Sequence, residues 1–345
     1  MWRRDFCVPG RDAADTSVCA HRLIFMDKIR IAVVGAGQFG RNHCRVVSQS
    51  QKAVLTAVVD TAPNRAAGIA AEYNCEDFTD YRQLAGKADA AIVAVPTCAH
   101  AEVGCFLMES GLDVLVEKPI APDPAAADRL FETAASTGRI LQVGHLERFN
   151  PAVAALERRV TLPLFFEIHR MSVFSPRSLD IDVVLDLMIH DIDIVLALVG
   201  AEPQDIRAAG ISVLSGTVDI ANVRLQFGSG CIANLTASRV STEKVRKLRL
   251  FQPRQYLSLD YGRQDLFILS VNEQRQVTPE PVFVMKSEPL QNQLDAFVES
   301  VRTRQIPKTS GARARQTLGV ALAILDKIKE HSELVSKTLV AEWNR

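Results

Sequence analysis

The chain has 345 residues, of which 48% are hydrophobic and 23% charged, values typical of a globular protein long enough for two domains. Its 40 basic and 40 acidic residues cancel, which argues against a broad nucleic-acid-binding face but allows local anion sites. The seven cysteines form no CxxC pair, so we expect no disulfide framework and no metal site, and a reducing, cytoplasmic location.

Residues 1–25 differ in character from the rest of the chain. They lack the apolar run of a secretory signal, and Met26 opens a segment that resembles a natural start. We expect 1–25 to be a disordered extension or a misassigned start. The most apolar stretch, 183–199, contains several acidic residues, so we expect a packed helix there and no membrane span.

From residue 29 to residue 143, short apolar strands alternate with helices, which predicts right-handed βαβ units in a parallel sheet. The strands are expected at 29–34, 54–59, 88–95, 112–116 and 140–143, and the helices at 42–50, 63–73, 99–109 and 125–137. This pattern predicts a dinucleotide-binding Rossmann domain over residues 26–145.

After about residue 150, runs of β character follow one another with few helices between them, which predicts a mostly antiparallel sheet. The extended runs are expected at 164–172, 211–214, 218–227, 231–238, 246–251, 256–259 and 266–269, and the helices at 182–199, 290–302 and 312–330. The predicted fold class is α/β, with an N-terminal Rossmann parallel sheet. A second α+β domain, on an open and mostly antiparallel sheet, is expected over 146–345.

A glycine-rich turn follows the first strand and opens the first helix. Gly35 permits the tight turn, Gly37 lets the backbone approach a pyrophosphate, and Gly40 lets helix and strand pack closely. Gln38 and Phe39 begin the helix, whose free N–H groups favour phosphate. The turn therefore predicts a dinucleotide site.

An acidic residue closes the second strand, as this site requires. Asp60 lies 20 residues after Gly40 and can accept hydrogen bonds from the adenosine ribose. Its carboxylate would repel a 2′-phosphate, so NAD is favoured. Arg65, which could pair with a phosphate or stack on adenine, leaves NADP open. Residues at the end of the third long strand are also expected to line the cofactor: Pro96, Thr97 and His100.

Three motifs together resemble the Gfo/Idh/MocA oxidoreductases over about residues 26–335. They are the Gly35–Gly40 turn, Glu117-Lys118-Pro119, and the DLMIH sequence at 186–190. The resemblance implies a Rossmann domain followed by an open antiparallel sheet that often mediates oligomerisation, and hence a homo-dimer or homo-tetramer. It also implies that Glu117 contacts the nicotinamide ribose and that Lys118 lies beside the cofactor.

Further stretches are similar to the nucleotide-sugar 3-dehydrogenases of this family. They are VGHLERFNP at 143–151, DLMIHDID at 186–193 and ASRVS at 237–241. The stretch DVVLD at 182–186 lacks the Gly-Gly pair that many relatives with other substrates carry there, which is also typical of this branch. This branch oxidises the 3-hydroxyl of UDP-N-acetylglucosamine, or of its uronic acid, ahead of transamination. The resemblance is greatest to the UDP-N-acetylglucosamine type, which supplies a diamino sugar for lipid A.

The chemistry of alcohol oxidation requires a hydride acceptor and a base for the hydroxyl proton. Lys118 follows the carboxyl end of a strand, where ligands of such sheets bind, and can donate to the developing alkoxide. Asp186 and His190 are spaced i, i+4 on the predicted helix, so the carboxylate can orient the imidazole. We predict His190 as the proton acceptor and Lys118 as its electrostatic partner, although either residue can move protons.

Other polar residues are candidates for substrate binding. Arg239, with Lys244 and Arg246, could hold the diphosphate of a nucleotide sugar or could form a solvated strand edge. Arg148 and Asp193 could bind substrate or belong to an internal polar network. The full set of substrate-binding candidates is Arg148, Asn150, Asp186, Asp193 and Arg239.

The predicted function is therefore NAD(P)-dependent oxidation of a sugar secondary alcohol to a ketone. An inositol or free-sugar dehydrogenase of the same family is the alternative within this class. A dinucleotide sensor without catalysis is the alternative from another class. The combination of Lys118, Asp186 and His190 disfavours the sensor, because a sensor needs no proton acceptor beside the nicotinamide.

Overall fold

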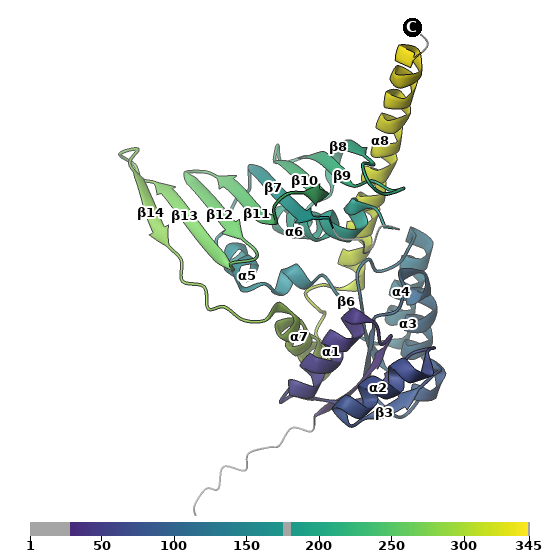
Figure 1. Ribbon diagram of the computed structural model, residues 1–345. Helices are drawn as coiled ribbons and strands as arrows, with labels where there is room; N and C mark the ends of the chain where they lie inside the picture. Colours follow the sequence, from purple (N-terminus) through teal and green to yellow (C-terminus); the bar gives the residue numbers. More distant parts are fainter. Residues whose placement is uncertain (1–27, 175–180, 344–345) are drawn as a thin grey trace, which may run out of the picture.

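The computed structural model describes residues 28–174 and 181–343, so the predicted extension at 1–25 lies outside the described residues. Figure 1 shows a parallel sheet flanked by helices in one half of the molecule and a broad second sheet in the other half. The predicted fold class, a Rossmann domain with a mostly antiparallel second sheet, is confirmed.

Within the described residues, the N-terminal strands form a six-stranded parallel sheet in the order β3-β2-β1-β4-β5-β6. This is the Rossmann strand order, in which ligands bind where the order reverses, between β1 and β4. The strands are β1 (Ile29–Val34), β2 (Ala53–Val59), β3 (Glu76–Phe78), β4 (Ala90–Val93), β5 (Asp113–Val116) and β6 (Leu141–Val143), and the main helices are α1 (Gln38–Gln49), α2 (Pro63–Tyr73), α3 (His100–Glu109) and α4 (Pro124–Thr137).

Local sequence explains where these elements begin and end. Pro63 and Pro124 occupy the first turns of α2 and α4, where a missing N–H costs nothing. Asp123 caps α4 by accepting from the backbone of Ala126, and Gly138 ends that helix in the left-handed region. We did not predict β3 from the sequence, because only one of its three residues is apolar and the strand is partly exposed.

The second sheet has eight described strands in the order β14-β13-β12-β11-β7-β10-β9-β8. All neighbours are antiparallel except β7 and β10. The strands are β7 (Phe165–Val173), β8 (Pro203–Ile211), β9 (Ile220–Phe227), β10 (Ile232–Ser241), β11 (Val245–Gln252), β12 (Gln255–Asp260), β13 (Asp265–Val271) and β14 (Val277–Pro281). Alternate residues face a core shared with helices α5 (Pro151–Glu157) and α6 (Ile189–Val199), as period-2 patterning requires.

The structure differs from the expectations for this half in three places. Residues 212–214 form a loop and not a strand: β8 ends at Ile211, and the N–H groups of Val213 and Leu214 bind the Asp219 carboxylate. The exposed, proline-containing edge strand β14 was not expected. The helix expected over 182–199 begins with a π-helical turn, Val184–Met188, before α6.

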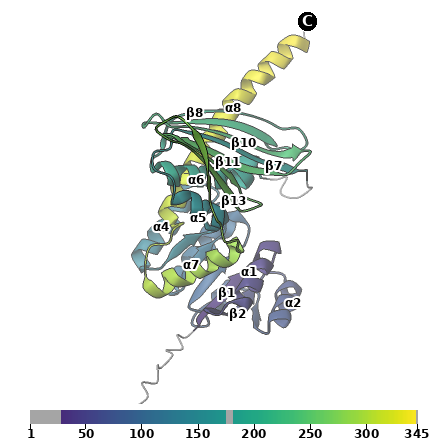
Figure 2. The same cartoon turned by 90° about the vertical axis from the view of Figure 1, so that its left-hand side faces the viewer.

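The last two helices join the two halves. From α7 (Pro289–Thr303), Leu294 and Phe297 pack into the core beneath β1. From α8 (Gly311–Trp343), Leu318 packs into the Rossmann core and Ile324 into the core of the second sheet. Figure 2 shows α7 beside α1 and α8 running past the second sheet. No helix in the described part of the chain is long and apolar enough to span a membrane.

Candidate active site

The glycine turn between β1 and α1 has the shape of a dinucleotide cradle. Gly35 has φ +99°, and a Cβ there would lie 2.4 Å from the carbonyl oxygen of Ala94. A Cβ on Gly40 would lie 1.7 Å from the Gly35 oxygen. By contrast, a Cβ on Gly37 would meet no described atom within 4 Å, so the turn is open on the side where a pyrophosphate would approach.

Asp60 fixes the adenosine side of this cradle. One carboxylate oxygen accepts from Ala36 N–H at 2.8 Å and the other accepts from Ala62 N–H at 2.9 Å. Arg65 approaches the same carboxylate at 3.4 Å. A cavity of about 530 Å³ opens here, and of the predicted cofactor residues it is lined by Gly35, Gly37, Gln38, Phe39, Asp60, Arg65 and Pro96. These residues fit NAD.

His100 and Thr97 do not line this cavity. The ring nitrogens of His100 lie 3.0 Å from the carbonyl oxygens of Pro119 and Val95, and the side chain is buried. His100 thus ties the end of β4 to the segment after Lys118, and its assignment to cofactor contact is corrected. Burial lowers its pKa, partly offset by these carbonyls.

A second cavity, of about 240 Å³, adjoins the cradle and contains the predicted catalytic residues. Phe39 lines both cavities, so a dinucleotide lying across the glycine turn would reach the second one. We call this second space the catalytic pocket. It is lined by Phe39, Asn42, Glu117, Lys118, Gly144, Leu146, Glu147, Arg170, Asp186, Leu187, His190, Arg246 and Leu290.

Lys118 and Asp186 form an ion pair at one side of the catalytic pocket. The Lys118 ammonium donates to the backbone oxygen of Asp186 at 2.7 Å and to its carboxylate at 3.1 Å. The expected contact between Asp186 and His190 is absent from the hydrogen bonds of the described residues. The π-helical turn at 184–188 alters the i, i+4 relationship that the prediction assumed, and the carboxylate pairs with Lys118.

His190 also lines the catalytic pocket, and its electrostatic setting keeps it neutral. Its Nδ1 is buried and has no hydrogen-bond partner in the described part of the structure. Burial, followed by the positive charges of Lys118 and Arg170, holds its pKa well below the usual 6.5. A neutral imidazole at physiological pH can accept a proton.

Glu117 lines the catalytic pocket next to Lys118. It accepts from the His43 ring at 2.7 Å, and a Cβ on Gly144 would lie 2.8 Å from its carboxylate. Burial alone would raise its pKa, but the His43 hydrogen bond and the nearby charge of Lys118 bring the pKa of Glu117 below its usual value. The glycine at 144 therefore makes room for an ionised and largely enclosed carboxylate.

Two arginines form the wall of the catalytic pocket nearest the second sheet. Arg170 of β7 and Arg246 of β11 are directly opposite in the antiparallel register, an arrangement that costs stability. Arg170 is neutralised, because it binds Asp191 at 2.7 and 2.8 Å and Glu147 at 2.9 Å. The sequence analysis missed Arg170, whose place beside Arg246 follows from strand register alone.

Arg246 is much less satisfied. Its nearest carboxylate, that of Glu147, lies at 3.8 Å and is already bound to Arg170. Its buried Nε has no acceptor among the described residues. Burial, and then the charge of Arg170, lower its pKa. Arg246 thus presents a poorly compensated cation to the catalytic pocket.

Three predicted substrate residues belong instead to an internal network. Arg148 pairs with Glu157 at 3.0 Å and with Asp193 at 3.4 Å. Asn150 caps α5 and donates to the backbone of Tyr261. Arg148, Asn150 and Asp193 are almost fully buried and do not line the catalytic pocket, so their assignment to substrate is corrected.

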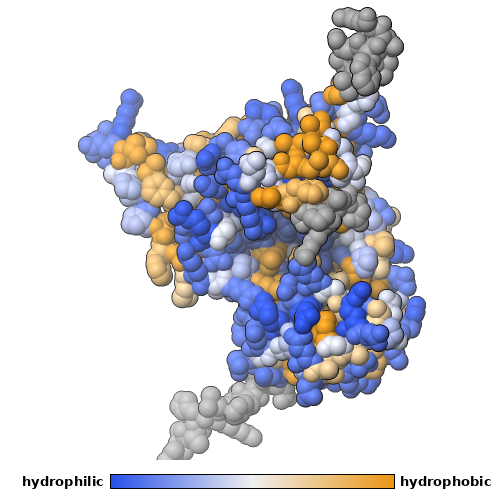
Figure 3. Space-filling view, in the orientation of Figure 1, coloured by the Kyte–Doolittle hydropathy of each residue, from blue (hydrophilic) through white to orange (hydrophobic). Residues whose placement is uncertain are grey.

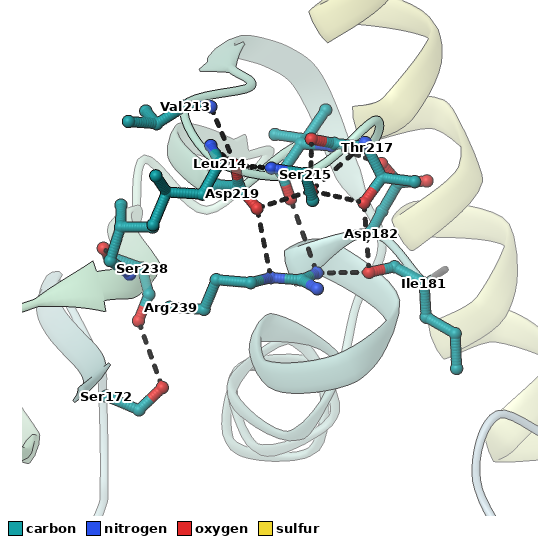
Figure 4. Close-up of polar contacts among 12 residues, drawn as sticks. Ser172, Ile181, Asp182, Val213, Leu214, Ser215, Thr217, Asp219, Ser238 and Arg239 are labelled. Carbon is teal, nitrogen blue, oxygen red and sulfur yellow. Dashed lines mark hydrogen bonds and ion pairs between the residues drawn. The ribbon is translucent and has the colours of Figure 1, made fainter. Parts of the chain in front are cut away.

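The assignment of Arg239 to substrate binding is also corrected, and Figure 4 shows the contacts that Arg239 makes instead. Its guanidinium donates to the backbone oxygen of Ile181 and faces Asp219 at 3.7 Å. Asp219 accepts from three consecutive N–H groups, those of residues 213–215. Arg239 therefore anchors the chain just before the π-helical turn that carries Asp186, outside the catalytic pocket.

Both halves of the chain match known protein families. A model of the oxidoreductase family with an NAD-binding Rossmann fold matches residues 29–145, and one of the GFO/IDH/MocA C-terminal domain matches 168–254. UDP-N-acetylglucosamine 3-dehydrogenase from Acidithiobacillus ferrooxidans is 34% identical over 305 residues, which are 87% of this chain and 97% of that protein. Its solved structure has a TM-score of 0.84, covering 89% and 99% of the two chains. An inositol 2-dehydrogenase from Rhizobium meliloti is 30% identical over 62% of this chain and 70% of that protein.

Proposed function

The chain belongs to the GFO/IDH/MocA oxidoreductase family and has its NAD-binding Rossmann domain, and from that premise we propose that it oxidises the 3-hydroxyl of UDP-N-acetylglucosamine. The product would be a 3-ketone, the group that a transaminase requires. UDP-N-acetylglucosamine 3-dehydrogenase is 34% identical over nearly the whole of both chains, whereas a myo-inositol 2-dehydrogenase that matches 88% of this chain is 24% identical.

Arg246 is the observation that carries this choice of substrate. A cation with an unpartnered Nε in the catalytic pocket suits an anion, because guanidinium groups bind phosphate oxygens in planar pairs. In a nucleotide sugar the diphosphate is attached at C1, and only C2 separates that atom from the reacting C3. An inositol is neutral and would leave Arg246 without a counter-charge.

The protein groups for the reaction are Lys118 and His190. Bound NAD supplies the hydride acceptor. The Lys118 ammonium already donates to two oxygens of Asp186, so it is suited to donate to the alkoxide as charge develops. His190 is neutral, and its Nδ1 has no hydrogen-bond partner among the described residues, so we assign to it the proton from the 3-hydroxyl.

We also propose that copies associate through the face of the second sheet that α5 and α6 leave uncovered. Figure 3 shows hydrophobic residues, in orange, on the surface of this half of the molecule. Phe251 and Phe267 are exposed there, and Phe251 contacts Phe165 and Tyr256 with ring centroids 5.9 and 5.1 Å apart. Apolar side chains gathered on one face indicate an interaction surface. Light scattering of Phe251→Ser/Phe267→Ser should report smaller particles than the wild-type chain; unchanged particle size would refute this interface.

The test of the proposed function measures NADH formation by the full chain with UDP-N-acetylglucosamine and, separately, myo-inositol. A matching aminotransferase with glutamate removes the ketone, so that equilibrium does not hide turnover. We expect turnover of the nucleotide sugar, with KM raised roughly 30-fold or more in Arg246→Gln, since losing a buried charge contact costs about 2 kcal/mol or more.

The matched control is Arg249→Gln on the same strand. Arg249 pairs with Glu167 at 3.1 Å and is more than a third exposed, and it does not line the catalytic pocket. Its loss should leave KM unchanged. Turnover of myo-inositol alone would favour the inositol alternative, and NAD binding without turnover of either compound would revive the sensor.

A further inference from the structure

The proton that His190 accepts must leave a buried position. For one ring nitrogen of a neutral imidazole to accept a proton from substrate, the other must carry the hydrogen. His190 lines the catalytic pocket while its Nδ1 is buried without a partner among the described residues. An unpaired buried N–H is unfavourable, so the Nδ1 side calls for an acceptor.

A second buried histidine lies on that route. The ring of His145, in the segment that follows β6, is 2% exposed. Its centroid is 6.4 Å from that of His190, with the two rings nearly perpendicular at 88°. Its Nδ1, too, is buried with no hydrogen-bond partner in the described structure. A separation of this size suits transfer through one bridging water.

Asp193 is a charged neighbour of His145 and lines a further cavity. Burial, helped by the charges of Arg148 and Lys118, holds the pKa of His145 below its usual value, so the ring releases a proton readily. Asp193 and Glu117 act in the opposite direction and attract a proton to it. Asp193 also accepts from the Thr317 hydroxyl at 3.3 Å. Asp193 and Thr317 line a cavity of about 210 Å³ whose other walls include the exposed residues 200–202 and 316. His145 lines neither cavity, but Asp193 of this outer cavity and Lys118 of the catalytic pocket both lie close enough to shift its pKa.

We propose that His145 relays the substrate proton from His190 to Asp193 and the water of this outer cavity. The inference rests on the proposed function, in which His190 is the base. His190 gains the hydroxyl proton at its pocket-facing nitrogen and releases the Nδ1 proton to His145. His145 then releases a proton towards Asp193 and solvent. The electron pair of the broken C–H bond leaves with the hydride to NAD, so charge and atoms balance.

His145 acts through His190 and does not line the catalytic pocket, so it is a positioning and relay residue. Its removal should affect proton transfer and not substrate affinity. After the transfer, the His190 ring carries its hydrogen on the pocket-facing nitrogen. It must lose that proton and regain one at Nδ1 from the same relay before the next turnover.

The test compares His145→Gln, which keeps polarity but cannot relay, with the wild-type chain. We expect kcat to fall roughly tenfold or more with KM and NAD affinity unchanged. The solvent deuterium isotope effect on kcat should increase, while the effect of deuterium at the reacting carbon should shrink, because proton transfer becomes slower than hydride transfer. Added imidazole should restore part of kcat in His145→Gly.

The matched control is His169→Gln, since His169 lies partly exposed on β7 and lines neither cavity. It should leave both isotope effects unchanged. A lower kcat in His145→Gln with unaltered isotope effects and no rescue would show a purely structural role and overturn the relay. Unchanged kcat would overturn it as well.

A second readout separates failure of the relay from failure of the proposed function. If UDP-N-acetylglucosamine is not turned over by the wild-type chain, the proposed function fails. The relay is then judged by NMR of the NAD-bound chain, from the rate at which the His190 Nδ1 proton exchanges with solvent. We expect exchange to slow at least severalfold in His145→Gln; an equal rate in the two proteins would refute the relay.

Discussion

Replacing Gly144 by alanine tests how the structure holds the Glu117 carboxylate in the catalytic pocket. The added Cβ would lie 2.8 to 2.9 Å from three atoms of the Glu117 carboxyl group, closer than side chains pack. The carboxylate cannot swing aside freely, because it is largely enclosed and bound to His43 at 2.7 Å. The substitution should therefore break that hydrogen bond.

The expected loss follows from the contact that breaks. A hydrogen bond to a charged group contributes about 1.5–3 kcal/mol, so Gly144→Ala should lower the free energy of unfolding by about 2 kcal/mol. Glu117 is expected to contact the nicotinamide ribose, so NAD should also bind about tenfold more weakly, equivalent to about 1.4 kcal/mol. Urea unfolding and calorimetric titration with NAD measure the two effects.

Substitution of a second, exposed glycine should change the free energy of unfolding in the opposite direction. Gly68 is exposed in α2, and a Cβ there would meet no described atom within 4 Å, so Gly68→Ala should stabilise the chain by about 0.5–1 kcal/mol. In a double-mutant cycle, Gly144→Ala should cost much less in a His43→Ala background. Equal costs in the two backgrounds, or a cost below about 0.5 kcal/mol in the wild type, would refute the reasoning.

Three further substitutions test other contacts. Because the folded-state pKa of Glu117 lies below its ordinary value of 4.5, its ionised form adds stability above that pH, and this is lost as pH falls through the depressed pKa. Glu117→Gln should thus flatten the acid limb of stability measured by urea unfolding; an unchanged limb would contradict the assignment. Asp219→Asn removes the carboxylate that binds three backbone N–H groups and faces Arg239, so unfolding should show a loss of about 3 kcal/mol, whereas a loss under about 0.5 would mean the loop is held otherwise. Asp60→Ala should weaken NAD binding about tenfold or more and NADP binding less, by fluorescence titration; equal losses would argue against contact with the ribose.

The cofactor half was accessible to sequence reasoning because its signals are local. The turn from Gly35 to Gly40 directly joins a buried strand to a helix, and Asp60 ends the next strand. Neighbouring parallel strands then bring these residues together. Lys118, Asp186 and His190 do line one pocket, because the Glu-Lys-Pro segment and the helix were each placed correctly.

The substrate half was less accessible because its contacts depend on register and burial. Arg148 and Arg239 were both candidates for substrate binding, but each folds against a buried carboxylate, Asp193 or Asp219, that is distant in sequence. Arg170 and Arg246 became neighbours through the pairing of β7 with β11. The π-helical turn defeated the i, i+4 argument for Asp186, since residue spacing alone does not distinguish it from an α-helical turn.

The most direct test of the central claim is the position from which hydrogen leaves the sugar. The chain is incubated with NAD and UDP-N-acetylglucosamine carrying deuterium at C3 or, in a parallel sample, at C4. We predict that deuterium from C3 appears in the NADH and slows its formation, and that deuterium from C4 stays on the sugar. Transfer from C4, or turnover of the C3-labelled compound that yields unlabelled NADH, would contradict the proposed reaction.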